Sequence, residues 1–539
     1  MNDLLRIILA ALAITSMVSC SEKNDVLHQN ETLFDLSQVR VVSEGRVYAR
    51  EYIERQLTNL QQSNDLDDEL AAAYDEFLSG KLEEVDEIEK QMKEDAGETE
   101  NGVNTMLAYE YVVLEYMTFS PNGDGIMCSE LVVWPWGALW NPRPDNVVIG
   151  CHCTITDDFS RPSNYENQGI TSDVAMLAMM THLKGDYNLV IIPDYEGYGS
   201  TVDRPHPYCY REATAWQVCD GVRAGISYYE HFKKTMEPDW RAVSVGYSQG
   251  GAVAAGVYRY AQENDKRLRV VGAVCGDGPY DPISTLQQYI KDGKLYMPVA
   301  AALILKGALD TSYELKKLKS QYWHFCTDAF IESGIFDMLE EKYLNTDTIH
   351  KELLAYASEE NSPFVMYCWD NKSESFEPYN HHTANSSAFD FNLSNGKAKS
   401  YAPIDQCFKQ GVIDYFQGKP VTPGDVDPDK LDALKHFLEK NSLLYGGWAP
   451  SAKSGMTFFH STRDEVVPVC NLDMLDSWWL GGHQDGYLAY WYETSTYLHV
   501  GTGKAFYLYY ADDYVNKIFK DKWKSGRYEI KGGLFQPME

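Results

Sequence analysis

The sequence predicts an α/β protein with a mainly parallel sheet, a large helical insertion and a helical segment ahead of the sheet. Between residues 146 and 274, short unbroken apolar runs alternate with longer stretches of helical spacing. This is the pattern of buried parallel strands joined by helical crossovers. From 283 to 450 the alternation stops, and it resumes at Met456. One sheet interrupted by one insertion explains this order.

The N-terminus predicts an export signal. Arg6 precedes the apolar run 7–18, which is too short to span a bilayer and fits a secretory signal. The run ends in Val18-Ser19-Cys20, which resembles the lipobox of bacterial lipoproteins. The resemblance implies cleavage before Cys20, acylation of its sulfur, and anchoring at the periplasmic face or the cell surface. Residues 1–19 are then a signal peptide, and 20–49 a tether and lead-in. The alternative is an ordinary secreted protein with an incidental cysteine.

Residues 50–103 predict an acidic helical segment. Leu70, Tyr74 and Leu78 fall at helical spacing, Ser79-Gly80 is a stop signal, and a second helix is expected from Leu82. The formal net charge of the whole chain is −32. Nucleic acid and anionic membrane surfaces are therefore not expected partners, because phosphate binding needs clustered lysine and arginine. Membrane association is expected only through the N-terminal lipid.

The core is expected to comprise residues 104–282 and 451–539. It opens with an antiparallel pair at 106–119 and 126–136, joined by the turn Pro121-Asn122-Gly123-Asp124-Gly125. Further strands are expected at 146–150, 187–192, 242–245, 268–274, 456–459 and 487–498. Helices are expected near 173–183, 212–229, 251–264 and 503–519. The insertion, 283–450, is expected to be mostly helical and to cap the core.

The pentapeptide Gly246-Tyr247-Ser248-Gln249-Gly250 joins a predicted strand to a predicted helix. In that context the two glycines leave room for a sharp turn that presents the serine hydroxyl above the sheet edge. The helix N-terminus favours negative charge, and the Gln249 backbone N–H is placed to stabilise an oxyanion. Ser248 is therefore the candidate nucleophile, against the alternative of an ordinary strand–helix turn.

Over residues 104–539 the chain resembles the α/β-hydrolases and, among them, the secretory lipase group. The resemblance rests on an ordered set of motifs: Asp194-Tyr195-Glu196-Gly197-Tyr198-Gly199, His206-Pro207-Tyr208, Asp220-Gly221-Val222-Arg223-Ala224, Gly246-Tyr247-Ser248-Gln249-Gly250-Gly251 and the run 460–468. It implies a nucleophile, an acid and a histidine in chain order. Asp464 and His499 follow Ser248 in that order, and the alternatives are a helix-capping carboxylate and a packed or surface histidine.

The second oxyanion donor is expected from the loop after Ile149. Many relatives carry His-Gly there, whereas this chain has His152-Cys153-Thr154. The backbone N–H of Thr154 or of Cys153 is the candidate, and His152 is expected to brace the loop.

The other residues considered for metal binding or catalysis are expected to have structural roles. His381-His382 has no carboxylate or cysteine at a metal-binding spacing, so no metal is expected, and the chemistry needs no cofactor. Asp220 and Arg223 are expected to form an internal ion pair. The ten cysteines after Cys20 show no disulfide framework, and buried free thiols are the usual state for such residues.

The sequence therefore predicts an exported, lipid-anchored serine hydrolase that acts on a small-molecule or lipid carboxylic ester. Two alternatives stay open. A serine peptidase of the same fold would share the triad, and a catalytically silent binding lipoprotein would use the fold alone. Acyl and alcohol specificity and the oligomeric state are not predicted.

Overall fold

A computed structural model describes residues 33–62, 66, 68–95, 105–139, 142–169, 171–384, 399–451, 455–479, 487–492, 498–523, 526–531 and 534–537. The signal sequence, Cys20 and residues 21–32 of the expected tether and lead-in lie outside these residues. Residues 34–539 cluster as one unit. None of the helices in the described ranges has the length and apolar character needed to cross a bilayer.

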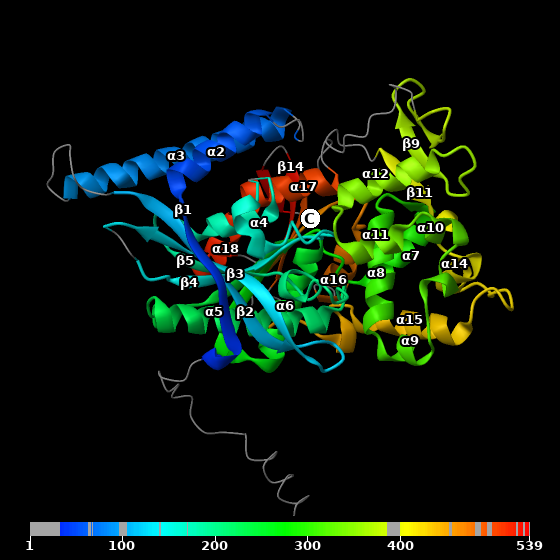
Figure 1. The fold of residues 1–539 in the computed structure, drawn as a ribbon, viewed down its shortest axis with the longest axis horizontal. Helices are drawn as coiled ribbons and strands as arrows, with labels where there is room; N and C mark the ends of the chain where they lie inside the picture. The colour runs from blue at the N-terminus through cyan, green and yellow to red at the C-terminus, as the bar shows by residue number, and fades with distance from the viewer. Residues whose placement is uncertain are drawn as a thin grey trace, which may run out of the picture. The chain divides into compact units, whose positions relative to one another are not determined.

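The centre of the fold is an eleven-stranded mixed sheet within the described residues (Figure 1). Its order is β1 (Val39–Tyr48), β2 (Leu107–Phe119), β3 (Gly125–Gly137), β5 (Asn188–Pro193), β4 (Asn146–Cys151), β6 (Ala242–Tyr247), β7 (Val270–Gly276), β12 (Gly455–Ser461), β13 (Tyr487–Tyr492), β14 (Gly526–Lys531) and β15 (Leu534–Pro537). Neighbours from β5 to β14 are parallel, and the pairs at both ends are antiparallel. Every strand predicted between 106 and 274 is confirmed.

Helices cover both faces of the sheet. One hydrophobic cluster joins the inner side chains of α2 (Ala49–Gln62), α3 (Asp68–Asp95), α4 (Asp173–Ala178) and α18 (Asp512–Phe519) to β2, β3 and β5. The long helices α5 (Arg211–Phe232) and α6 (Gln249–Asn264) pack against each other and against β2, β5, β6 and β7. The strands between these layers are almost wholly buried, as parallel strands covered on both faces must be.

The N-terminal segment is helical, but the predicted break at Ser79-Gly80 is wrong, because its two helices are α2 and α3, which pack against each other. Helix α3 runs through Gly80 without interruption. Leu78 and Val85, on either side of Gly80, are fully buried in the same cluster. Burying both outweighs the roughly 1 kcal/mol that a glycine costs inside a helix. Strand β1, within the expected lead-in, was not predicted, and it pairs antiparallel with β2 along its length.

The segment 283–450 has a hydrophobic cluster largely of its own. Its helices are α7 (Pro282–Asp292), α8 (Pro298–Thr311), α9 (Tyr313–Lys317), α10 (Asp328–Glu332), α11 (Ile335–Glu341), α12 (Thr346–Ala357), α13 (Ile404–Cys407), α14 (Gln410–Phe416) and α15 (Pro428–Lys440), in green to yellow in Figure 1. A small four-stranded sheet was not predicted: β10 (Ser375–Tyr379), β9 (Met366–Asp370), β11 (Ser400–Pro403) and β8 (Lys294–Leu295). Strands this short leave little periodicity in the sequence.

The C-terminal region departs most from prediction. The expected strand 487–498 ends at Tyr492, and His499 is the first residue of helix α17 (His499–Ala505). The helix predicted at 503–519 starts at His499, four residues earlier than expected. A π-helical turn (Phe506–Ala511) joins α17 to α18. Helix α16 (Cys470–Trp479) lies between β12 and β13, and the strands β14 and β15 were not predicted.

Short 3₁₀ turns complete the described structure: Leu36–Gln38, Pro162–Asn167, Met179–Thr181, Gly199–Thr201, Lys266–Leu268, Tyr322–His324 and Tyr445–Gly447.

Candidate active site

Ser248 occupies a sharp turn between β6 and α6. Its φ of 57° and ψ of −125° lie in a region that non-glycine residues rarely adopt, as expected for a strained nucleophile turn. Its N–H donates to the Gly276 carbonyl (2.9 Å), which ties the turn to the end of β7. A Cβ at Gly246 or Gly250 would lie 2.4 or 2.1 Å from the Cys151 carbonyl oxygen, so only glycine lets β4 approach the turn this closely.

The structure brings Ser248, His499 and Asp464 together. The Ser248 Oγ is 2.9 Å from Nε2 of His499, and the His499 Nδ1 is 2.5 Å from Oδ2 of Asp464. All three side chains are at least nine-tenths buried. His499 is at the start of α17 and Asp464 follows β12, so both meet Ser248 at the carboxyl edge of the sheet.

The surroundings hold the acid and the imidazole in place. Backbone N–H groups of Val466 (2.8 Å) and Val467 (2.6 Å) donate to Oδ1 of Asp464, which leaves Oδ2 for the imidazole. Burial, together with the negative charge of Asp277, raises the pKa of Asp464. Burial lowers the pKa of His499, against the opposing effect of Asp277 and Glu465. The imidazole is therefore neutral at physiological pH and can accept a proton at Nε2.

The loop after β4 lies against the nucleophile turn. The Cys153 N–H donates to Asp173 Oδ2 (2.5 Å), and the Thr154 hydroxyl is 2.8 Å from the Tyr208 hydroxyl. His152 braces this loop as expected: it stacks on Tyr195, and its Nδ1 lies 2.7 Å from the Cys153 carbonyl oxygen.

Gln249 is the first residue of α6, where a helix has no carbonyl of its own to accept the N–H. Its side chain points elsewhere, with Nε2 2.7 Å from Nε2 of the buried His206. The backbone N–H thus begins the helix beside Ser248 while the amide side chain is held by a neighbour.

Three residues around the triad were not singled out from the sequence. The Tyr247 hydroxyl donates to the His499 carbonyl (2.7 Å) and also contacts the Asp277 carboxylate. Oε2 of Glu465 accepts a hydrogen bond from the backbone N–H of His499 (3.0 Å). Asp277 follows β7 directly, and its place at a strand's carboxyl end was a signal that could have found it.

Replacing Glu465 by glutamine is expected to stabilise the protein increasingly as pH rises. Burial raises the pKa of Glu465 from 4.5 to about 7, so the folded protein holds this proton to higher pH than the unfolded chain. Ionisation therefore costs folding free energy as pH rises from 4.5 through 7. The expected gain is on the order of 1–3 kcal/mol at pH 8 and much smaller at pH 5. Urea unfolding of the parent and Glu465→Gln proteins at pH 8 and pH 5 measures this gain in the free energy of unfolding. A difference that does not change with pH would contradict the raised pKa of Glu465.

The remaining sequence candidates lie elsewhere. Asp220 and Arg223 form the expected ion pair, which Asp265 extends. His381 and His382 are exposed and adjacent in a turn of the insertion. His483, the other histidine that follows Asp464 in the sequence, lies outside the described residues. The ten cysteines that the structure describes are free thiols.

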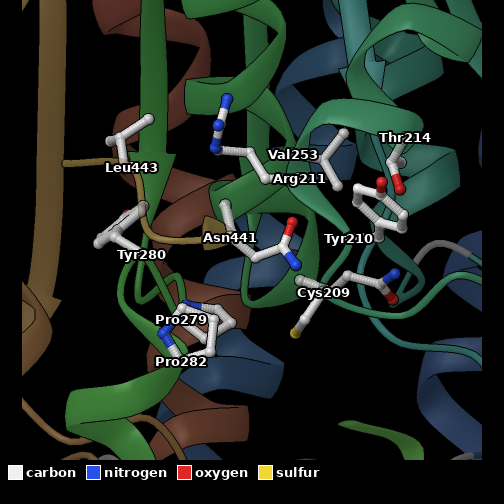
Figure 2. A pocket seen from close by; sticks show the side chains of 12 residues that line it. Cys209, Tyr210, Arg211, Thr214, Val253, Pro279, Tyr280, Pro282, Asn441 and Leu443 are labelled. Atoms are coloured by element: carbon white, nitrogen blue, oxygen red, sulfur yellow. The ribbon is translucent and has the colours of Figure 1, made fainter. Parts of the chain in front are cut away.

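A small cavity, which Gln249 helps to line, lies between the starts of α5 and α6 and the segments after β7 and α15 (Figure 2). Its volume is about 30 Å³, and its lining is mostly apolar, with Tyr210, Val253, Pro279 and Leu443 among the residues. This volume suits about one water molecule and is too small for an ester substrate.

Residues 161–348, which include Ser248, match the model of the secretory lipase family. A search of curated proteins gives no match to the chain.

Solved structures show the same fold at low identity. The rice cell wall degrading esterase LipA from Xanthomonas oryzae has a TM-score of 0.56 and 14% identity, over 88% of this chain and 96% of that one. A putative hydrolase from Legionella pneumophila has a TM-score of 0.52 and 14% identity, over 90% and 99%. Candida antarctica lipase A in its closed state has a TM-score of 0.50 and 11% identity, over 77% and 78%. The chain therefore has the α/β-hydrolase fold, and the segment that carries Ser248 matches the secretory lipase family.

Proposed function

We propose that this protein is an exported serine hydrolase that cleaves carboxylic esters. The observation that carries the proposal is the unbroken hydrogen-bonded series from Ser248 Oγ through the His499 ring to Asp464 Oδ2, at 2.9 and 2.5 Å. The secretory-lipase match over residues 161–348 supports an ester as substrate. A serine hydroxyl is a weak nucleophile at neutral pH, and this series supplies the base and the orienting carboxylate that activate it.

The reaction proceeds through an acyl-enzyme. The Ser248 Oγ attacks the acyl carbon while Nε2 of His499 takes the hydroxyl proton. The tetrahedral intermediate collapses, and His499 returns the proton to the leaving alcohol. Water then attacks the acyl-enzyme by the same two steps and releases the acid. Asp464 keeps the proton on Nδ1 and stabilises the imidazolium that forms twice in each cycle.

The oxyanion of each tetrahedral intermediate is stabilised by backbone N–H groups. The Gln249 N–H is one donor, supported by its position at the start of α6. The Thr154 N–H is the second. The Cys153 N–H was the other candidate, but it already donates to Asp173, which favours Thr154.

Residues 283–450 act as a cap beside the acyl site, on a core of 104–282 and 451–539. Three contacts with the segments that follow β4 and β5 support this assignment. Lys342 Nζ donates to the carbonyls of Gly197 (2.7 Å) and Val202 (2.6 Å), and the Thr156 hydroxyl donates to the Leu344 carbonyl (2.7 Å). We expect an insertion held at these segments to contact the acyl or alcohol group of the ester and to exclude water from the site.

A panel of nitrophenyl esters of varied acyl length, assayed beside aminoacyl nitroanilides, tests the proposal. Ester turnover at least tenfold above nitroanilide turnover supports it. The reverse order would favour the peptidase, which shares the triad. A purified, folded protein that turns over neither class and fails to react with a fluorophosphonate would favour the silent binding lipoprotein.

Replacing Cys20 by alanine is expected to move the protein from the detergent phase to the aqueous phase in phase separation. The reason is the apolar run ending in Val18-Ser19-Cys20, whose resemblance to a lipobox implies that Cys20 becomes the acylated first residue of the mature chain. Extracts of cells that express each form measure the partition. A Ser21→Ala variant is the matched control and should stay with the detergent. Equal partition of the Cys20→Ala and parent proteins would show that there is no acyl anchor.

A further inference from the structure

A second buried carboxylate lies beside the catalytic histidine. Asp277, at the carboxyl end of β7, is fully buried. One carboxylate oxygen of Asp277, one of Asp464 and one ring nitrogen of His499 all lie within 4.8 Å of one another. Within the described part of the chain, this is the single group of three such side chains this close together. The triad as proposed needs only one acid, so the second buried carboxylate requires an explanation.

We propose that Asp277 is a second positioning acid of the catalytic centre, which shares with Asp464 the stabilisation of the His499 imidazolium. This inference rests on the proposed function, because it needs His499 to gain and lose a proton during turnover. The two carboxylates approach the ring from different strands: Asp277 follows β7, and Asp464 follows β12.

The contacts of Asp277 hold its charge in place without neutralising it. The Ser461 N–H donates to Oδ1 (2.7 Å), and the Tyr247 hydroxyl contacts Oδ2. His460 Nδ1 is 3.4 Å from Oδ1, a distance longer than an ordinary hydrogen bond. Neither arginine nor lysine forms an ion pair with Asp277 among the described residues. Its charge therefore acts on the ionisable groups around it, which include His460, His499 and Asp464.

Tyr247 connects the second acid to the histidine backbone. Its hydroxyl lies between the Asp277 carboxylate and the His499 carbonyl oxygen, which is 2.7 Å away. Tyr247 is also the residue before the nucleophile, so Asp277, the histidine and the nucleophile turn are joined through one buried side chain. A bare structural carboxylate would not need this connection to both partners of the proton transfer.

The proton balance is unchanged by the second acid. When Ser248 attacks, its hydroxyl proton moves to Nε2, and the ring becomes cationic while both carboxylates stay as they were. Asp464 accepts the hydrogen bond from Nδ1, and Asp277 contributes only through its charge. If Asp464 is truncated, Asp277 and Glu465 are the carboxylates that remain near His499, so part of the stabilisation persists, and Asp277→Asn measures the share that Asp277 carries.

A double-mutant cycle tests the inference. The substitutions are Asp277→Asn and Asp464→Ala, and the readout is kcat/KM for a nitrophenyl ester. Asparagine can still accept from the Ser461 N–H. Asp277→Asn is expected to cost less than tenfold when Asp464 is present and at least tenfold more when Asp464 is alanine. An equal factor in both backgrounds would mean that Asp277 is only structural, and would overturn the inference.

The pH profile gives a readout that a structural role would not move. Removing the Asp277 charge destabilises the imidazolium, so the acid limb of kcat/KM should move to lower pH, by about 0.5 unit or more. The titratable groups facing this centre are Tyr247, Tyr280, Tyr289, His460, Asp464 and Glu465. None of them is altered in the Asp277→Asn protein. An unshifted acid limb would contradict the inference, even if the double variant failed to fold.

Asp281→Asn is the matched control. Asp281 is equally buried and follows the same strand, but its carboxylate caps α7 by accepting the Ser284 N–H. Asparagine caps helices as well as aspartate does, so kcat/KM and the acid limb should stay unchanged. If Ser248→Ala retained activity, the proposed function would fail and the inference with it. If Ser248→Ala is inactive but the cycle is additive, only the inference fails.

Discussion

Replacing Ser248 by alanine is expected to lower kcat/KM for nitrophenyl esters by on the order of 10⁴-fold or more, while the protein still folds. The reason is that Ser248 Oγ supplies the bond-forming atom, 2.9 Å from its base, and nothing else at the turn can replace it. Alanine fits the turn because it adds no atom to the crowded contact with Cys151. Steady-state kinetics and thermal unfolding of the variant measure both parts of the expectation.

Ser244→Ala is the matched control for this variant. Ser244 lies on β6, the strand that leads into the turn, is fully buried, and donates its hydroxyl to the Ala254 carbonyl (2.8 Å). Its loss removes one hydrogen bond near the turn, so we expect activity within tenfold of the parent. A Ser248→Ala protein that also kept activity within tenfold would remove Ser248 as the nucleophile.

Replacing His499 by alanine is expected to match the loss in Ser248→Ala. The His499 ring is hydrogen-bonded to both Ser248 and Asp464, and it carries the proton in both half-reactions. Because triad members act as a unit, the double variant Ser248→Ala/His499→Ala should be little worse than either single variant. Multiplying losses would show that the two residues act independently, against a shared triad.

His483→Ala is the control for the histidine assignment, and we expect it to cost less than tenfold. His483 also follows Asp464 in the sequence, but it precedes β13, whereas His499 follows β13 and begins α17. If His483→Ala were inactive and His499→Ala were active, the assignment of the catalytic histidine would be wrong.

The order of the core elements could be predicted because each has an unambiguous local pattern. Strands β4, β5 and β6 are short apolar runs, and the glycines at 246 and 250 mark a turn that no larger residue could form. Chain order then placed Asp464 and His499, and the structure brings both to Ser248.

The missed elements have weak local signals. Strand β1 is largely exposed, so its sequence lacks the apolar alternation that marks a half-buried strand. The expected strand before His499 was too long: β13 ends at Tyr492, where the apolar run ends and the polar residues 493–496 begin. Asp277 was not predicted because its role depends on its proximity to Asp464 and His499. Those residues are distant in the sequence, and a local pattern does not show that they lie close in space.

Peptide mapping after reaction with a fluorophosphonate tests the central claim most directly. We expect one adduct per protein, on the peptide that contains Ser248, with ester turnover lost in proportion to labelling. The Ser248→Ala and His499→Ala proteins should not label at a comparable rate. A folded parent protein that hydrolyses esters yet stays unlabelled, or that is inactivated by an adduct on another residue, would contradict the account.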